Sequence, residues 1–137
     1  MKIRIVGGRP PNFEAIAAVF PEAKRDGVIF TYGDTIYVAG TVAPNLSPAL
    51  RAHEAMHSQR QAMIGGPALW WDRYLADADF RLKEELIAHR AEYGTVRQTV
   101  KDRNHVAQHL HQIASRLASK LYGNMMTLAE AKRALLA

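Results

Sequence analysis

Apolar positions divide the chain into a mixed front part and a helical back part. Glycine, proline and β-branched residues concentrate before about residue 48, whereas the remainder is rich in Ala, Leu, Arg, Gln and His. Apolar residues spaced three and four apart predict a short helix over Asn12–Phe20, which Pro21 ends. Two β-branched and aromatic runs, Val28–Tyr32 and Thr35–Ala39, are separated only by Gly33-Asp34, which predicts a tight hairpin.

Local start and stop signals define the helices of the back part. Ser47-Pro48 begins a helix, because a serine hydroxyl accepts a hydrogen bond from a free backbone amide and proline fits the first helical position. This helix is expected to end near Met63, before Gly65-Gly66-Pro67. Thr127 and Glu130 form a capping-box pattern that begins a short last helix. Three further helices are expected, over about Leu69–Leu75, Phe80–Val100 and Asn104–Leu121.

The composition fits one folded domain without cysteine chemistry. A chain of 137 residues buries roughly two-thirds of the surface that its unfolded form exposes, which is enough for a core. The sequence contains no repeat and no linker long enough to separate domains, so residues 1–137 are expected to form a single domain. Because there are six histidines and no cysteine, disulfides and thiolate metal sites are excluded, and any metal ligand must be His, Asp or Glu.

Charge and hydropathy set expectations about partners and location. Eighteen Lys and Arg against thirteen Asp and Glu give a net charge of +5. The basic residues spread over the predicted helices without interleaved aromatic residues, which is typical of a solvated surface and argues against a nucleic-acid partner. No window approaches the ~18 consecutive apolar residues of a membrane span, and the first apolar run is too short for a signal peptide. We therefore expect a cytoplasmic protein with no membrane partner.

The helix that begins at Ser47-Pro48 contains an HExxH motif, formed by His53, Glu54 and His57. Residues four apart lie on one helix face with their Cβ atoms about 5–6 Å apart, so the two histidines can bind one metal ion. Glu54 lies beside that ion, where it can act as general base toward a zinc-activated water. About 0.01 such motifs are expected by chance in a chain of this composition, so the motif predicts a zinc-dependent hydrolase.

A third metal ligand is needed, because a catalytic zinc ion normally has three protein ligands and an open position for water. The next predicted helix offers Glu84, Glu85, His89 and Glu92. Glu85, His89 and Glu92 share one face of this helix at spacings of four and three, whereas Glu84 lies on a different face of the helix. Helical periodicity leaves the choice among them open.

With its motif followed some thirty residues later by Glu85-Leu86-Ile87-Ala88, the chain resembles the gluzincins. These are zinc metallopeptidases whose third ligand is a glutamate on the helix after the HExxH helix. More narrowly, the chain is similar to small phage- and prophage-encoded zincin-like metallopeptidases and to the single-domain minigluzincins. The segments that carry the resemblance cover most of the chain: Phe30–Tyr37, His53–Gln61, Trp70–Tyr74, Phe80–Tyr93 and Leu121–Asn124.

The resemblance implies an α+β fold of zincin type, with a small β-hairpin or sheet of the N-terminal part packed on the active-site helix and a mainly helical C-terminal half. It implies His53, His57 and Glu85 as ligands of Zn2+ and Glu54 as the general base. The substrate would be a peptide or protein that binds in extended form along an edge strand, here Thr35–Ala39.

The chain departs from the gluzincin pattern four residues after Glu85. Many of these enzymes have an aspartate there, which does not bind the metal but orients a ligand histidine through a hydrogen bond. His89 occupies this position, and it either hydrogen-bonds differently or joins the metal. Zincins also stabilise the oxyanion of the reaction with a Tyr or His. His89 and Tyr93 are candidates for this role, and both can instead be packing residues.

Two other groups of residues allow a functional and a structural interpretation. The spacing of His105, His109 and His111 would suit a second metal site, but no acidic residue accompanies them, which favours a solvated or boundary position. Trp70-Trp71 could line a substrate cleft, although adjacent tryptophans after a Gly-Gly-Pro turn more often cover a core.

The leading hypothesis is a zinc-dependent endopeptidase that hydrolyses peptide bonds through a zinc-activated water, with Glu54 as base. The alternative is a catalytically weak or inactive zincin-fold binding or regulatory phage protein. The presence of Glu54 between both histidines favours the enzyme, because a binding site needs ligands but no base. A di-metal carboxylate bundle is a weaker third hypothesis, since the glutamate-to-histidine spacing is four and the front part contains a hairpin.

Overall fold

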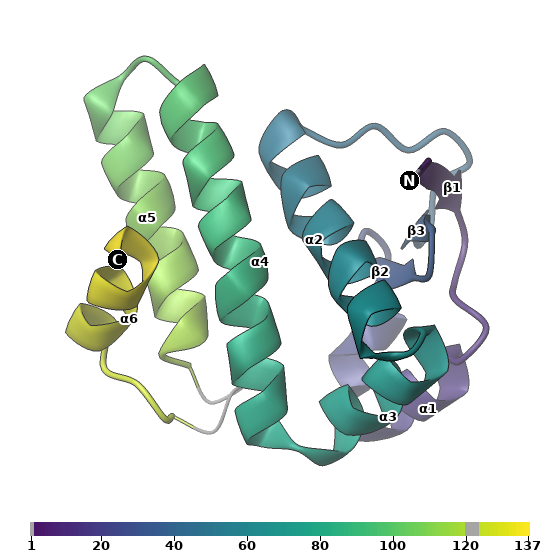
Figure 1. Cartoon of the computed structure of the whole chain (residues 1–137). Helices are drawn as coiled ribbons and strands as arrows, with labels where there is room; N and C mark the ends of the chain where they lie inside the picture. Colours follow the sequence, from purple (N-terminus) through teal and green to yellow (C-terminus); the bar gives the residue numbers. More distant parts are fainter. Residues whose placement is uncertain (1, 120–123) are drawn as a thin grey trace.

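The protein has an α+β fold in which helices predominate. The computed structural model describes residues 2–119 and 124–137, and within these ranges it contains a three-stranded mixed sheet and six α-helices (Figure 1). The expected α+β class is confirmed, with the strands in the front part and most helices in the rest. No helix in the described ranges combines the length and the apolar character needed to cross a bilayer.

The sheet consists of β1 (Arg4–Gly7), β2 (Ile29–Tyr32) and β3 (Thr35–Val38). The last two strands form the predicted antiparallel hairpin around Gly33-Asp34. The first strand, which the sequence pattern does not predict, pairs with β3 in parallel orientation. The strand order β1-β3-β2 makes β3 central. The expectation that Thr35–Ala39 is the edge strand is therefore wrong, because β1 covers its far side, and β2 is the edge strand that borders the helices.

Local capping chemistry starts the helices where the sequence predicts. In α2 (Pro48–Ile64), the Ser47 hydroxyl accepts a hydrogen bond of 3.2 Å from the backbone amide three residues later. In α6 (Leu128–Leu136), the Thr127 and Glu130 side chains each accept a hydrogen bond from the other residue's backbone amide, which confirms the capping box. The remaining helices are α1 (Phe13–Val19), the 3-10 turn η1 (Pro21–Lys24), α3 (Pro67–Ala76), α4 (Ala78–Thr99) and α5 (Arg103–Leu117).

Several helix boundaries differ from expectation, and α4 begins at Ala78 rather than at about Phe80. Helix α3 begins two residues earlier than predicted, at Pro67, because proline suits the first helical turn. Helix α5 ends at Leu117, before the expected end at Leu121. Of the predicted continuation over residues 118–121, residues 120 and 121 lie outside the described residues. Asn124 after it has a positive φ of 54°, a conformation that asparagine tolerates in a turn.

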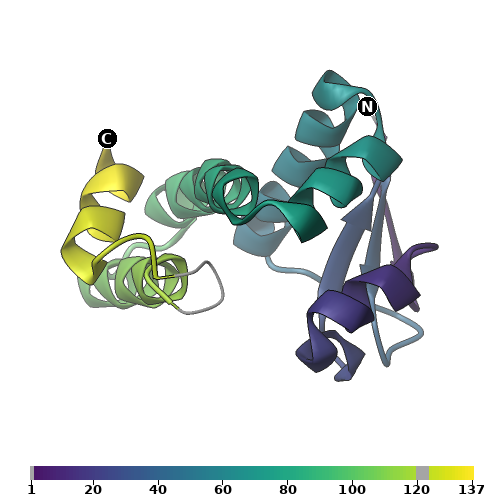
Figure 2. The ribbon, with the colours of Figure 1, turned by 90° about the horizontal axis from the view of Figure 1, so that it is seen from below.

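Two hydrophobic cores lie on either side of α4. The first contains residues of α1, η1, β2 and α3, and Trp70 and Trp71 are buried in it, which supports their core interpretation. The second lies between α4, α5 and α6. Figure 2 shows α4 between the two parts, with the sheet on one side and α5 and α6 on the other. Because Phe80 belongs to the first core and Tyr93 to the second, the part of α4 between them is held against α2.

Candidate metal centre

The buried face of α2 is polar where it meets α4. His53, Glu54 and His57 are only 5–7% exposed, although an ordinary amphipathic helix would bury aliphatic side chains here. Buried polar groups are costly unless they are paired with other polar groups. The partners come from α4, whose buried residues include Glu85, His89 and Glu92.

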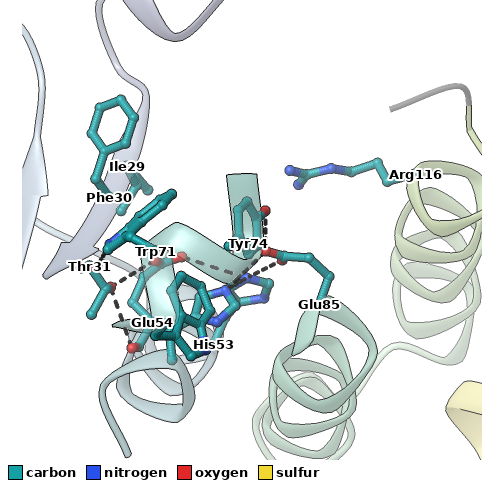
Figure 3. Close-up of a pocket in the computed structure, with 11 residues that line it drawn as sticks. Ile29, Phe30, Thr31, His53, Glu54, Trp71, Tyr74, Glu85 and Arg116 are labelled. Carbon is teal, nitrogen blue, oxygen red and sulfur yellow. Dashed lines mark hydrogen bonds and ion pairs between the residues drawn. The ribbon is translucent and has the colours of Figure 1, made fainter. Parts of the chain in front are cut away.

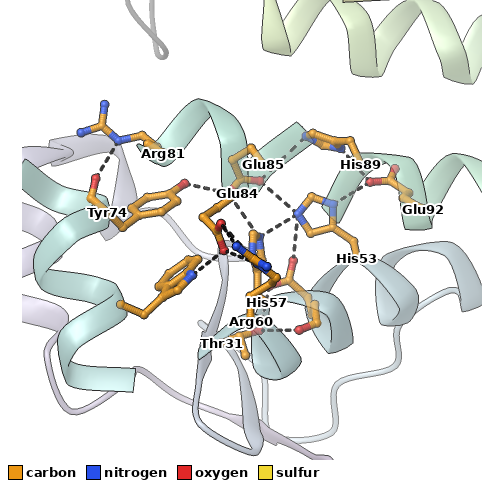
Figure 4. Close-up of polar contacts among 12 residues, drawn as sticks. Thr31, His53, His57, Arg60, Tyr74, Arg81, Glu84, Glu85, His89 and Glu92 are labelled. Carbon is orange, nitrogen blue, oxygen red and sulfur yellow. Dashed lines mark hydrogen bonds and ion pairs between the residues drawn. The ribbon is translucent and has the colours of Figure 1, made fainter. Parts of the chain in front are cut away.

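Three of these side chains converge on one point between the helices. The Nε2 atoms of His53 and His57 lie 3.2 Å apart, and the Glu85 carboxylate lies 3.2 Å from each, through Oε1 and Oε2 respectively (Figure 4). Two ligands bound to a tetrahedral zinc ion at 2.0–2.1 Å lie about 3.3 Å apart. The spacing of the three predicted ligands therefore fits a zinc ion. Two other buried groups also bring their ligand atoms close enough to hold a metal, His53 with Glu54 and His57, and His53 with His89 and Glu92.

The predicted base, Glu54, lies beside this group rather than within it. Its Oε2 is 3.6 Å from Nε2 of His53, while its Oε1 accepts a hydrogen bond of 2.9 Å from the Thr31 hydroxyl. Thr31 lies on the edge strand β2, so the sheet positions the carboxylate. The sequence pattern does not indicate this role for Thr31, because the contact joins residues that lie far apart in the chain.

Glu92 contacts His53 on the ring nitrogen that faces away from Glu85. Its Oε1 accepts a hydrogen bond of 2.9 Å from Nδ1 of His53. A proton fixed on Nδ1 leaves the Nε2 lone pair of a neutral imidazole free for a metal. The shared helix face of Glu85 and Glu92 is visible in the sequence, but their opposite positions around His53 depend on how α4 packs on α2.

His89 and His109 complete the set of Glu92 partners. Nδ1 of His89 donates to Oε1 of Glu92 at 3.0 Å, and Nε2 of His109 donates to Oε2 at 2.6 Å. Within the described ranges, Nε2 of the fully buried His89 has no hydrogen-bond partner, and it lies 3.9 Å from Oε1 of Glu85. His109 lies at the boundary with solvent, as expected, whereas His105 and His111 are exposed.

Charge coupling within the cluster changes the protonation of its members. Burial lowers the pKa of His53, but hydrogen bonds to Glu85 and Glu92 and the charge of Glu54 outweigh this and raise the pKa to about 10. Burial raises the pKa of Glu85, yet the charge of His57 and hydrogen bonds from both ligand histidines hold it well below its usual range. The Nε2 proton of His53 therefore competes with a metal ion for the same position.

The outer residues of the cluster are shifted as well. Burial raises the pKa of Glu92, but hydrogen bonds from His53, His89 and His109 outweigh burial and lower it. Burial is the main reason that the pKa of His89 is lowered. A neutral His89 with its proton on Nδ1 has an unshared lone pair on Nε2, which is the atom that this side chain could offer to a metal.

A pocket of about 160 Å³ opens at the candidate metal centre. Its walls include β2 at Ile29–Thr31, the HExxH residues of α2, and Glu85 of α4 (Figure 3). The Tyr74 hydroxyl, from α3, donates a hydrogen bond of 2.8 Å to Oε2 of Glu85. Arg116 of α5 also lines the pocket. Tyr74 and Arg116 are additional residues of the site that the sequence does not single out.

The structure does not bring Tyr93 to this pocket. Its side chain is buried in the second core with Ile113 and Leu117, which favours the packing interpretation over oxyanion stabilisation.

Glu84 is also separate from the metal ligands. Its carboxylate binds the Arg60 guanidinium at 2.9 Å and accepts a hydrogen bond of 2.8 Å from Nε1 of Trp70, so it ties α4 to α2 and α3.

Comparisons with known proteins identify no relative of this chain. No protein-family model, curated protein or solved structure matches it. The functional conclusion rests on the sequence motif and the geometry of the candidate site.

Proposed function

We propose that this protein is a zinc-dependent metallopeptidase of gluzincin type that hydrolyses a peptide bond. The observation that carries the proposal is the convergence of His53, His57 and Glu85 at 3.2 Å, with Glu54 beside them. These three residues would hold Zn2+, as the HExxH spacing predicts. When bound, zinc supplies a Lewis acid and lowers the pKa of a water molecule to about 7.

Glu54 would move the proton of the reaction. Its carboxylate would accept a proton from the attacking water and then donate it to the amide nitrogen of the leaving group, so the base returns to its starting state. The Thr31 hydroxyl holds Oε1 of this carboxylate, which leaves Oε2 on the side of His53. Tyr74 and Trp71 border the same pocket and restrict the access of water to the scissile bond.

The outer edge of β2 supports binding of an extended substrate at Ile29. In a two-residue hairpin, Tyr32 pairs with Thr35 and Phe30 with Tyr37 through hydrogen bonds, so the backbone groups of Ile29 and Thr31 face away from β3. Side chains of α2 and α3 already donate to the Thr31 carbonyl. Within the described ranges, the Ile29 amide and carbonyl have no partner and can pair with a substrate backbone.

Metal analysis combined with two substitutions tests the proposal. Protein purified without added metal should contain about one zinc ion per chain. Glu54→Gln should retain the zinc and abolish peptide hydrolysis, because the amide cannot accept the proton. Glu85→Gln should lower zinc content as well as hydrolysis. Glu14→Gln, an exposed change of the same type on α1, is the matched control and should leave both unchanged.

The outcomes separate the enzyme from its alternative. Equal hydrolysis by the Glu54→Gln variant would exclude Glu54 as the base. Protein that is zinc-free and takes up no zinc on titration would exclude the metal centre. A zinc-loaded wild-type protein that cleaves no member of a peptide library would instead support a non-catalytic zincin-fold binding protein.

A further inference from the structure

A cation from a distant helix lies beside the metal centre. Arg116 is the only Lys or Arg among the described residues that line the metal pocket. It belongs to the last turn of α5, and Figure 3 shows its side chain extending from this helix toward Tyr74 and Glu85. The guanidinium therefore reaches the pocket from the side opposite to the sheet.

The same side chain borders two neighbouring pockets. Each has a volume of about 280 Å³, and each is lined by Ile29 as well as Arg116. Ile29 is the β2 residue whose backbone groups are free to pair with a substrate. A peptide that pairs with Ile29 of β2 would thus lie close to Arg116, both in the metal pocket and in the two pockets next to it.

The Arg116 guanidinium has no partner within residues 2–119 and 124–137. Other arginines near the core are engaged: Arg60 binds Glu84, and Arg81 donates to two backbone carbonyls. Among the described residues, none forms a hydrogen bond or an ion pair with the Arg116 side chain. An unpaired guanidinium offers donors in a planar fork that matches a carboxylate.

The charges around the pocket make this position selective. With zinc bound, the +2 charge of the ion would balance the carboxylates of Glu54 and Glu85 that line the pocket. Arg116 is then the remaining unbalanced charge among the described residues of the pocket lining. We propose that Arg116 binds a carboxylate of the peptide substrate, from an acidic side chain or from the chain terminus, and so determines specificity. This inference rests on the proposed function, since it takes a peptide as the ligand of the β2 edge.

Peptide retention without turnover tests the inference directly. Zinc-loaded full-length Glu54→Gln protein is dialysed against three decapeptide mixtures: one with Asp or Glu and an amidated end, one with a free terminal carboxylate only, and one with neither. The bound peptides are quantified by mass spectrometry. The same measurement is made with double variants that combine Glu54→Gln with Arg116→Gln or with Arg116→Lys. Arg103→Gln, an exposed change on the same helix, is the matched control.

We expect one carboxylate mixture to be retained at least about fivefold more than the neutral mixture, the gain typical of a charge-assisted pair that is partly shielded from water. Arg116→Gln should remove this preference, Arg116→Lys should keep part of it, and Arg103→Gln should keep all of it. The identity of the retained mixture distinguishes a side-chain carboxylate from a terminal one.

Equal retention of all three mixtures, no retention of any, or an unchanged preference in Arg116→Gln would overturn the inference. Cleavage assays on wild-type protein separate this failure from that of the proposed function. Cleavage without carboxylate preference would leave the peptidase standing and remove the role of Arg116. Carboxylate-dependent retention without cleavage would keep the role of Arg116 in binding and exclude the peptidase activity. A loss of turnover in Arg116→Gln that is equal for neutral and acidic peptides would indicate transition-state stabilisation instead and would also overturn the inference.

Discussion

At the scale of single residues, Glu92 is the carboxylate that joins His53 to the two histidines outside the predicted ligand set, His89 and His109. Seven residues correspond to about two helical turns, so Glu92 returns to the face that carries Glu85 and His89. Its Oε1 accepts hydrogen bonds from Nδ1 of both His53 and His89. One carboxylate therefore fixes the ring of a predicted ligand and that of the buried histidine next to it.

Replacing Glu92 by Gln should weaken zinc binding. The amide keeps one acceptor but loses the charge that holds the His53 imidazole, and such outer partners typically contribute about 10–100-fold to metal affinity. Competition with a chromophoric chelator measures the zinc dissociation constant. His109→Gln is the comparison, because it removes only the Oε2 partner and should have a smaller effect. Equal zinc affinity in the wild-type and Glu92→Gln proteins would show that Glu92 does not position His53.

At the scale of elements, the contact between α2 and α4 depends on a polar tie as well as on packing. Glu84 is 1% exposed, and it bonds both Arg60 of α2 and Trp70 of α3. Because Glu85 follows it in the chain, this tie sets the rotation of α4 that points the next residue at the metal ligands.

Glu84→Ala should therefore destabilise the fold by about 3 kcal/mol, since it leaves the indole N–H of Trp70 and the Arg60 charge without their buried acceptor. Urea denaturation followed by tryptophan fluorescence measures the free energy of unfolding. Asp72→Asn, an exposed change on α3, is the control and should change it by less than about 0.5 kcal/mol. A similar small change for Glu84→Ala would mean that packing alone holds α4.

Helix positions follow from the sequence because their signals are local. The Ser47 cap and the Thr127 capping box each involve residues within one turn, and the hairpin depends on two turn residues. In contrast, β1 has only four residues and pairs with a strand some thirty residues later. Which strand forms the edge depends on that pairing, so local patterns cannot determine it.

The candidate site shows the same division between local and distant contacts. The HExxH spacing predicts the adjacent histidines, and the second helix face predicts acidic partners for them. The roles of Thr31 and Tyr74 depend on contacts across 23 and 11 residues of sequence. Tyr93 is a candidate that the sequence suggests and the structure does not bring to the site. It lies one residue after Glu92 and yet points into the second core.

At the scale of the whole molecule, the candidate metal centre lies where the two parts of the fold meet. His53 and His57 come from α2, which contacts the sheet, while Glu85 comes from α4, which also carries the second core. A bound ion would therefore join both parts of the chain. The same site holds buried charges whose repulsion and desolvation a metal would relieve, so metal binding and folding should be coupled.

Zinc should stabilise the protein in a way that depends on pH. Free zinc at 1,000 times its dissociation constant adds about 4 kcal/mol to the free energy of unfolding, which corresponds to a rise in Tm of at least about 8 °C. Because the pKa of His53 is raised to about 10, zinc must displace its proton near neutral pH. The apparent affinity should then increase with pH, up to about tenfold per unit between pH 6 and 8.

The raised pKa of His53 also predicts how the metal-free protein responds to pH. A folded-state pKa of about 10 against the ordinary histidine pKa of 6.5 contributes stability that is fully present below pH 6.5 and is lost as the pH rises through 10. Zinc-loaded protein should lack this loss, because the ion replaces the proton. Calorimetric titrations in buffers of different ionisation enthalpy should detect about one proton released per zinc ion at pH 7, in the wild type and in the exposed-site control His111→Gln alike. Binding without proton release would show that His53 is already neutral in the metal-free fold.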